Sequence, residues 1–379
     1  MESKKGDPPS LRHRCARVEM SSNHSQDRGS EMQVTMYGVD LAKQVLQVHW
    51  VEPDTGEVKR KVLARGEFAA FFAPRASGLV AMEACGSAHH WGRQLRALGH
   101  EVRLISTQFV RPFVKGNKTD AADARAIWEA AQRPEMRFVA LKSELQQAVL
   151  GLHRMRAQLV KMRTMQANQV RGLLYEFGVV LPRSWRALLL QAAAILADDT
   201  RGEVPELIRG QLLQQLQGLR ELTRRIDELE RSIGTYRKQD EQCRRIQAIP
   251  GVGALSLTAV LASIGDARTF RSGREFAAFL GLVPRQSGTG GRVRLLGISK
   301  RGDPYLRTLL IHGARTILNH STRPGRLPPP RLQGLLSRRP KNVIIVALAN
   351  KIARTIWALL AHGRDFDPRW RQALPASVL

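Results

Sequence analysis

The stretch MYGVDLAKQVLQVHWVEPDTGEVKRKVL, residues 36–63, decides the fold of the N-terminal part of the chain. Its apolar, branched and aromatic residues predict strands at Met36–Asp40, Val45–Val51 and Glu57–Leu63. The turn sequence Pro-Asp-Thr-Gly at 53–56 separates the second strand from the third. The stretch therefore predicts three consecutive strands that begin a sheet.

The following residues continue this sheet with alternating helices and strands. Helical spacing at Phe68, Phe71 and Phe72 predicts a first helix. We then expect strands at Leu79–Met82 and Val102–Ile105, and helices at Trp91–Leu98 and Thr119–Ala131. Three strands followed by helix, strand, helix, strand and helix is the element order of the ribonuclease-H-like fold. The sequence therefore predicts an α/β domain of this class.

Four carboxylates stand at the ends of these elements. Asp40 closes the first strand, Glu83 follows the fourth, and Asp120 and Asp123 lie on one face of the last helix. Taken singly, the aspartates suit ordinary roles, with Asp120 as a helix cap, Asp123 as a first-turn acid and Asp40 in a turn. Glu83 is less easily explained, because a carboxylate in an apolar strand costs free energy without a partner. Together the four favour a metal site, and their hard oxygen ligands suit Mg²⁺.

Two long helical segments follow, at residues 143–177 and 206–238. Leu152, Met155, Leu159 and Met162 form one heptad-like seam, and Leu222, Ile226, Leu229 and Ile233 form another. A stretch from Pro182 to Pro205 joins the two segments. We therefore expect an antiparallel coiled-coil arm, which serves either as a plain spacer or as a surface for homo-oligomerisation.

A glycine-rich turn opens the C-terminal part. Ile-Pro-Gly-Val-Gly-Ala-Leu-Ser at 249–256 is typical of a helix-hairpin-helix, in which Gly251 and Gly253 let backbone N–H groups approach a phosphate. The alternative is a glycine-rich turn between two helices.

Residues 284–301 form a basic, glycine-rich segment that we interpret as a loop. Ser287 and Thr289 offer hydroxyls for attack on a phosphate, and a flexible loop that only binds DNA is the alternative that local sequence favours. Cations that would neutralise the phosphate surround them: Arg285, Arg292, Arg294, Lys300 and Arg301.

The composition agrees with a nucleic-acid partner. The 379 residues carry 60 Lys and Arg against 33 Asp and Glu, a net charge of +27. From His320 onward, eleven Lys or Arg stand against two Asp. Charge alone leaves open a ribosomal or chromatin-type binding protein. Three scattered cysteines (Cys15, Cys85 and Cys243) and the lack of an apolar run of about 20 residues predict a cytoplasmic protein without a membrane span.

Several motifs together resemble one family. They are Gly-Val-Asp-Leu-Ala-Lys (38–43), Met-Glu-Ala (82–84), Asn-Lys-Thr-Asp-Ala-Ala-Asp-Ala (117–124), Pro-Gly-Val-Gly (250–253), Gly-Leu-Val-Pro-Arg (281–285) and Ile-Ser-Lys-Arg-Gly-Asp (298–303). Their order is similar to that of insertion-sequence transposases with an N-terminal Asp-Glu-Asp-Asp domain, the bridge-RNA-guided recombinases. The resemblance spans about residues 36–365.

The resemblance implies a site, partners and a location. Asp40, Glu83, Asp120 and Asp123 would be the tetrad that holds Mg²⁺, and a C-terminal serine would attack DNA and form a covalent phosphoserine link. A structured RNA encoded by the element would choose the DNA sites, in a prokaryotic, nucleoid-associated protein. The family commonly has Pro-Arg-Gln, one residue, then Ser-Ser-Gly-Gly. Here Thr289 takes the place of the nucleophile, and Ser287 lies two residues earlier.

This comparison divides the chain into five parts. They are an N-terminal extension that we expect to be disordered or to come from a misassigned start (1–33), a ribonuclease-H-like domain (34–140), a coiled-coil arm (141–240), a C-terminal transposase domain (241–365) and a tail (366–379). Two other hypotheses stay open: a Holliday-junction-resolvase-like nuclease that uses the tetrad alone, and an inactive copy that only binds nucleic acid. A proofreading-type exonuclease is disfavoured, because that class needs a second acid where Ala42 stands.

Overall fold

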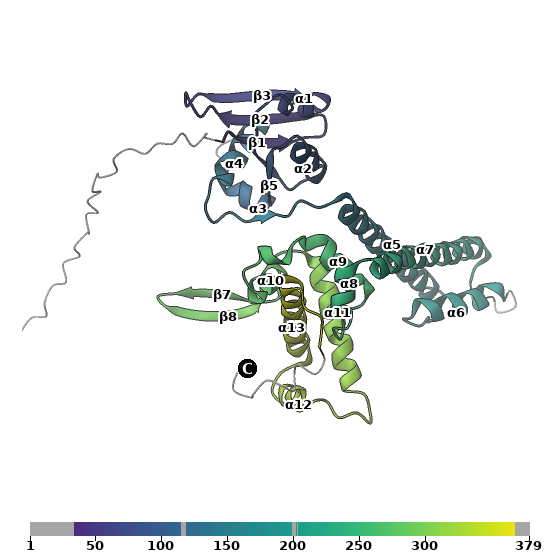
Figure 1. Cartoon of the computed structure of the whole chain (residues 1–379). Helices are drawn as coiled ribbons and strands as arrows, with labels where there is room; N and C mark the ends of the chain where they lie inside the picture. The colour runs from purple at the N-terminus through teal and green to yellow at the C-terminus, as the bar shows by residue number, and fades with distance from the viewer. Residues whose placement is uncertain (1–33, 115–118, 199–201, 203, 368–379) are drawn as a thin grey trace, which may run out of the picture.

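A computed structural model describes residues 34–114, 119–198, 202 and 204–367. The predicted N-terminal extension and most of the predicted tail lie outside the described residues. Three parts are visible in Figure 1: a sheet domain, a helical arm, and a helical C-terminal domain from which a two-stranded hairpin projects.

The N-terminal sheet has six strands in the order β3-β2-β1-β4-β5-β6. Their bounds are β1 Met36–Leu41, β2 Val45–Val51, β3 Val58–Ala64, β4 Leu79–Glu83, β5 Glu101–Ile105 and β6 Phe138–Val139. β1 pairs antiparallel with β2 and parallel with β4, and β4 pairs parallel with β5. The five predicted strands are confirmed within two residues, and β6 is an addition that the sequence analysis missed.

Helices cover both faces of this sheet. On one face, α1 (Phe68–Phe72) and α2 (Ala88–Ala97) bury large side chains against Val39, Val80 and Met82. On the other face, α3 (Thr107–Val110) and α4 (Asp120–Ala131) pack over Leu79, Ala81 and Ile105. Because side chains alternate along a strand, each strand contributes to both layers. The predicted α/β fold is confirmed, and it is consistent with a ribonuclease-H-like domain.

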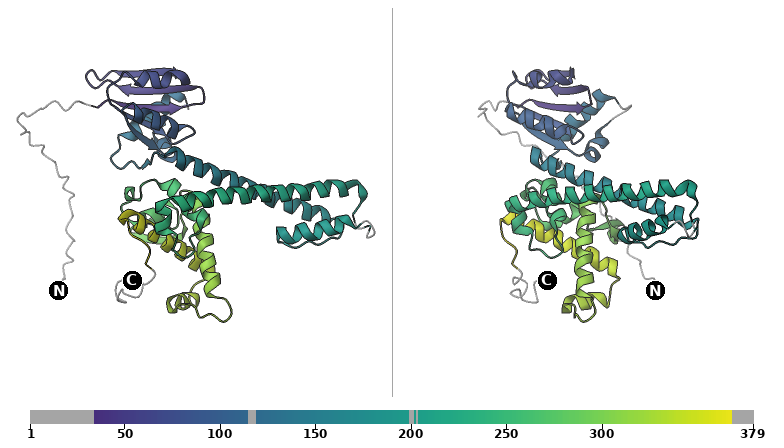
Figure 2. Two further views of the ribbon diagram at one scale, coloured as in Figure 1. Left: turned by 45° about the vertical axis from the view of Figure 1, so that its right-hand side comes forward. Right: turned by 90° about the vertical axis from the view of Figure 1, so that its right-hand side faces the viewer.

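In the described part of the arm there are three α-helices. α5 (Glu144–Tyr175) and α7 (Glu206–Gln239) lie side by side, and Figure 2 shows them extending away from the other two parts. The third helix, α6 (Trp185–Ala197), occupies most of the stretch that the sequence analysis treated as a proline-rich connection. Its residues Leu188, Ala192 and Leu196 are buried against α5 and α7, so α6 is part of the core of the arm.

The predicted seam of α5 is only partly buried. Leu159 packs with Leu222 and Ile226 of α7, whereas Met155 and Met162 are 49% and 45% exposed. The reason is that α5 contacts different neighbours along its length: α9 near its start, α7 in its middle and α6 near its end. A strict heptad stripe cannot serve all three neighbours.

The C-terminal domain has one large hydrophobic core. It is built by α8 (Glu241–Ile246), α9 (Ala254–Ile264), α10 (Gly273–Phe279), α11 (Pro304–Ser321), α12 (Pro330–Leu336) and α13 (Lys341–His362). Within the described residues, α13 is the one helix whose length and apolar composition would allow it to span a membrane. Ile345, Ala349, Ile352 and Ile356 of α13 lie in the domain core, so we interpret it as the central helix of this domain.

Candidate functional site

Strand β1 and helix α4 come unusually close at Gly38. A Cβ atom on this residue would collide with the carbonyl oxygen of Ala124 and with Cβ of Trp128. Trp128 fixes the contact further, because its Nε1–H donates a 3.1 Å hydrogen bond to the carbonyl oxygen of Met36. Asp40 is two residues beyond Gly38 on the same face of β1, so it faces the N-terminal end of α4.

Glu83 reaches the same side of the sheet from β4. The parallel register pairs Val39 with Met82, which brings Asp40 and Glu83 to the same end of adjacent strands. Leu79 and Ala81 of β4 belong to the core layer beneath α4, and alternation places Glu83 on that face as well. The hydroxyl of Thr107, at the start of α3, donates a 2.6 Å hydrogen bond to Oε1 of Glu83.

Helix α4 supplies the other two acids from its first turn. The cap is Thr119, whose Oγ1 accepts a 3.3 Å hydrogen bond from the N–H of Ala122. The suggestion that Asp120 itself caps the helix is therefore wrong. Both Asp120 and Asp123 are free of that role, and their charges are favoured near the positive end of the helix dipole.

The electrostatics show that the four acids interact. The pKa of Asp40 is raised to about 6, first by burial and then by the charges of Asp123, Asp120 and Glu83. Mutual repulsion of this kind is relieved when a cation binds among the carboxylates. A carboxyl group with a raised pKa among other carboxylates at the end of a sheet is a common feature of functional sites.

The donor set fits a hard divalent cation, since all four side chains offer carboxylate oxygens. Within the part of the chain that the structure describes, no three acids are already gathered closely enough to form a ligand shell. Asp40, Glu83, Asp120 and Asp123 are the residues that would hold such an ion.

The predicted glycine-rich loop is a β-hairpin instead. β7 (Pro284–Thr289) pairs antiparallel with β8 (Arg292–Ile298), with Ser287 opposite Arg294 and Thr289 opposite Arg292. Gly290 and Gly291 make the two-residue turn with φ of 57° and 78°, values that this type of turn requires. The glycine content of the segment suggested a flexible loop. Pairing between β7 and β8 instead fixes the hydroxyls of Ser287 and Thr289 on one exposed face of the hairpin.

Close backbone packing holds the base of the hairpin. The guanidinium Nη1 of Arg307 donates 3.1 Å hydrogen bonds to the carbonyl oxygens of Leu280 and Arg301, which flank the hairpin. A Cβ on Gly281 would collide with the backbone of Arg301. Lys300 adopts a left-handed φ of 55°, a strained conformation for a residue with a side chain.

The turn at residues 249–253 joins α8 to α9, but its two glycines differ in their surroundings. A Cβ on Gly251 would collide with Gly313 of α11, so this glycine permits close helix packing. Gly253 caps α9, and a Cβ there would meet nothing within 4 Å. Of the two, only Gly253 leaves open space for a phosphate.

Comparison with known proteins decides the family. Residues 37–178 match the profile of the DEDD transposase domain of IS110 elements, and residues 243–327 match that of the IS116/IS110/IS902 transposase family. A "Probable family 20 transposase" of Pseudomonas aeruginosa is 51% identical over 338 residues, covering 89% of this chain and 100% of the relative. The chain belongs to the IS110/IS116 transposase family.

Other relatives of this transposase agree. The transposase for insertion sequence element IS1111A of Coxiella burnetii is 41% identical over 363 residues, covering 95% of this chain and 99% of the relative. The transposase for insertion sequence element IS1328 of Yersinia enterocolitica is 40% identical over 335 residues, covering 88% and 99%. The protein is therefore a DNA transposase of an insertion sequence.

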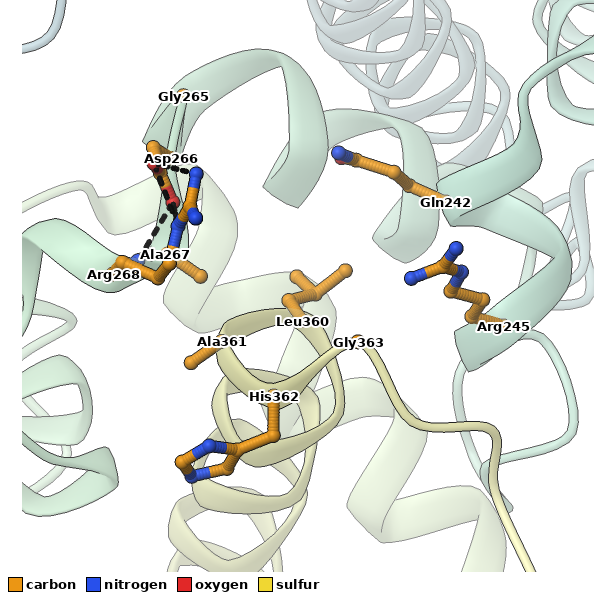
Figure 3. A pocket seen from close by; sticks show the side chains of 10 residues that line it. All are labelled: Gln242, Arg245, Gly265, Asp266, Ala267, Arg268, Leu360, Ala361, His362 and Gly363. Atoms are coloured by element: carbon orange, nitrogen blue, oxygen red, sulfur yellow. Dashed lines mark hydrogen bonds and ion pairs between the residues drawn. The ribbon is translucent and has the colours of Figure 1, made fainter.

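The transposase also has a polar hollow of about 650 Å³ at the ends of α9 and α13 (Figure 3). Its arginines have local partners: Arg268 bonds Asp266, and Arg245 lies 2.8 Å from Glu241. None of the predicted site residues lines this hollow. We assign it no part in the reaction.

Two contacts of the transposase were missed by the sequence analysis. One is the hydrogen bond from the hydroxyl of Thr107 to Glu83, for which the only signal was that Thr107 lies two residues after a predicted strand. The other is His153 of α5, whose ring nitrogens lie 2.9 Å from the hydroxyls of Tyr305 and Thr258. In addition, Nδ1 of His89 accepts a 3.2 Å hydrogen bond from the N–H of Lys142 in the connection to the arm.

Proposed function

We propose that this transposase cuts and rejoins DNA through a covalent protein–DNA link, with Mg²⁺ held by the acidic tetrad and the nucleophile on the β7–β8 hairpin. The observation that carries the proposal is the convergence of Asp40, Glu83, Asp120 and Asp123 on one end of the sheet, expressed in the raised pKa of Asp40.

The tetrad would bind the ion through carboxylate oxygens from β1, β4 and α4. When bound, Mg²⁺ would stabilise the charge on the attacking hydroxyl oxygen and on the deoxyribose oxygen that leaves. Other residues of the chain position these carboxylates. Gly38 lets α4 approach Asp40, and Thr107 orients Glu83.

The nucleophile would be the hydroxyl of Thr289, with Ser287 as the alternative. Both hydroxyls point from the same face of β7, about 7 Å apart along the strand. Arg292 and Arg294 share that face and would neutralise the phosphate under attack. Attack forms a phosphoester to the protein and breaks one phosphate ester bond of the DNA, which frees a deoxyribose hydroxyl. The reverse reaction with another DNA end rejoins the strand.

Sequence choice would come from a structured RNA of the element, as the family resemblance implies. The net charge of +27 suits a protein that neutralises two nucleic acids. The arm would join copies of the chain into a homo-oligomer, and Gly253 would support a phosphate contact in a helix-hairpin-helix manner.

A second candidate is a resolvase-like nuclease that uses the tetrad alone. The placement of the hairpin favours it, because the hairpin projects from the C-terminal domain and stands apart from the N-terminal sheet (Figure 1). The covalent reaction requires the two to come together, whereas hydrolysis does not.

Trapping of the protein–DNA adduct separates these functions. Purified transposase, DNA that carries the element with its flanks, and RNA transcribed from those flanks are incubated with Mg²⁺, and adducts are mapped by peptide mass spectrometry. We expect Thr289→Ala to abolish the adduct and Thr289→Ser to raise its yield. Thr316→Ala, which removes an exposed hydroxyl on α11, is the matched control and leaves the yield unchanged.

The outcomes are distinct. An adduct on Ser287 moves the nucleophile two residues. Metal-dependent cleavage without any adduct supports the nuclease, and salt-sensitive binding without cleavage identifies an inactive copy. Glu83→Ala should abolish recombination if the tetrad takes part in the reaction. Normal recombination by this variant would show that the acids have no catalytic role.

A further inference from the structure

The β7–β8 hairpin is almost entirely exposed to solvent. Every residue of β7 is exposed, and β8 contributes only Leu296 and Ile298 as half-buried side chains. A two-stranded hairpin without a covered face is only marginally stable in water. The packing at Arg307 and Gly281 fixes its base, and the rest of the ribbon leaves both faces open to a partner.

The cross-strand register gives this hairpin two chemically different faces. Ser287, Thr289, Arg292 and Arg294 form the hydroxyl face. The opposite face carries Gln286, Val293 and Leu295, and we call it the apolar face. Val293 and Leu295 are 68% and 62% exposed, although both are large apolar side chains.

The charge of the segment identifies the partner class. Residues 276–302 contain five Lys or Arg and no Asp or Glu. Two copies of this hairpin would repel each other, so a second copy of the chain is a poor occupant. A polyanion is attracted to the segment, and nucleic acid combines such a charge with flat apolar surfaces, the faces of unstacked bases.

We propose that the apolar face of the hairpin contacts the bases of the DNA beside the phosphate that meets the hydroxyl face. The inference rests on the proposed function of the hairpin as carrier of the nucleophile. Val293 and Leu295 would rest on bases that unstack at the cut, as aliphatic wedges do in proteins that kink DNA. The DNA would then contact the hairpin on both faces, so that the nucleophilic hydroxyl keeps a fixed distance to the phosphate that it attacks.

Photocrosslinking tests the contact directly. Leu295 is replaced by p-benzoylphenylalanine in full-length transposase, which is irradiated in cells that carry the element with its flanking DNA. We expect cross-links to DNA near the exchange point. The same replacement at Val62, a valine of β3 that is 57% exposed, is the control and should give a background level. Cross-links from position 295 to protein, or to nucleic acid no more often than from position 62, overturn the proposal.

Substitution tests what the contact does. The double variant Val293→Ser with Leu295→Ser should lower the adduct yield at least tenfold, and Val293→Ile with Leu295→Met should preserve it. An unchanged yield in the serine variant overturns the inference. Failure of the proposed function gives a different result. An adduct that survives both Thr289→Ala and Ser287→Ala would show that neither hydroxyl is the nucleophile. The cross-link from position 295 tests the base contact independently of that result.

Discussion

Oγ1 of Thr107 donates a 2.6 Å hydrogen bond to Oε1 of Glu83, and this bond joins two parallel strands at the end where the acids gather. Thr107 follows β5, and Glu83 ends β4. The hydroxyl occupies one carboxylate oxygen and leaves the other available to a cation. Thr107 is therefore a positioning residue for Glu83.

We predict that Thr107→Val weakens Mg²⁺ binding by roughly tenfold, the usual effect of removing a partner that orients a metal ligand. Thr107→Ser, which keeps the hydroxyl, should restore the affinity. Calorimetric titration of the protein with Mg²⁺ measures the change. Thr164→Val on α5 is a matched control, because the hydroxyl of Thr164 donates only to the carbonyl oxygen of Val160. Equal affinity of Thr107→Val and the wild type would contradict the prediction.

The raised pKa of Asp40 predicts a pH-dependent stability. A pKa of about 6 in the folded protein exceeds that of an unfolded aspartate, about 3.9, so the folded state binds the proton more tightly. This contribution to stability is present below pH ~4 and is lost as the pH rises through ~6.

Asp40→Asn removes the charge of Asp40, so the stability of this variant should not fall as the pH rises through ~6. We expect the variant to be more stable than the wild type at pH 7 without metal, by on the order of 1 kcal/mol after allowance for solvent screening. The difference should disappear near pH 4. Urea unfolding in the presence of a chelator measures it, and a wild type that is the more stable protein at pH 7 would show that cations of the chain already compensate Asp40.

The contact between β1 and α4 predicts the effect of a single methyl group. Gly38→Ala places Cβ against Ala124 and Trp128, so α4 must move away from β1. We expect a loss of about 1–3 kcal/mol in the free energy of unfolding, and weaker Mg²⁺ binding because Asp120 and Asp123 move with the helix. Gly66→Ala is the control, since a Cβ there meets nothing within 4 Å. Equal stability of Gly38→Ala and Gly66→Ala would refute the close packing.

The buried His153 predicts a pH dependence of the opposite sign. Burial, and secondarily Arg156, lowers the pKa of His153 to about 4. The neutral ring is favoured in the folded protein, so the stability it contributes is present above pH ~6.5 and is lost as the pH falls towards 4. His153→Phe should cost about 2 kcal/mol at pH 7, because it removes a buried and a partly buried hydrogen bond between the arm and the C-terminal domain.

This cost should shrink as the pH is lowered from 7 to 4. The control is His312→Phe, a replacement of an exposed histidine on α11. A cost that stays constant between pH 7 and pH 4 would mean that His153 is not kept neutral by its surroundings.

The N-terminal fold could be predicted from the sequence because its signals are local. Strand β2 matches the prediction residue for residue, since a run of branched and aromatic side chains between turn sequences has few other conformations. The three-residue spacing of Asp120 and Asp123 places both on one helix face wherever the helix lies. The parallel pairing of β1 with β4, which brings Asp40 beside Glu83, follows from the ribonuclease-H-like order of elements that the sequence predicts.

Only the tertiary structure decided the rest, because it depends on contacts between distant segments. Ser287 and Thr289 belong to a glycine-rich sequence that is equally compatible with a loop, and pairing with Arg294 and Arg292 makes it a ribbon with two faces. His153 gives no sign in its own helix of its partners, which lie 105 and 152 residues away. Local propensity determines elements, but the free energy that selects these partners arises only when the core closes around them.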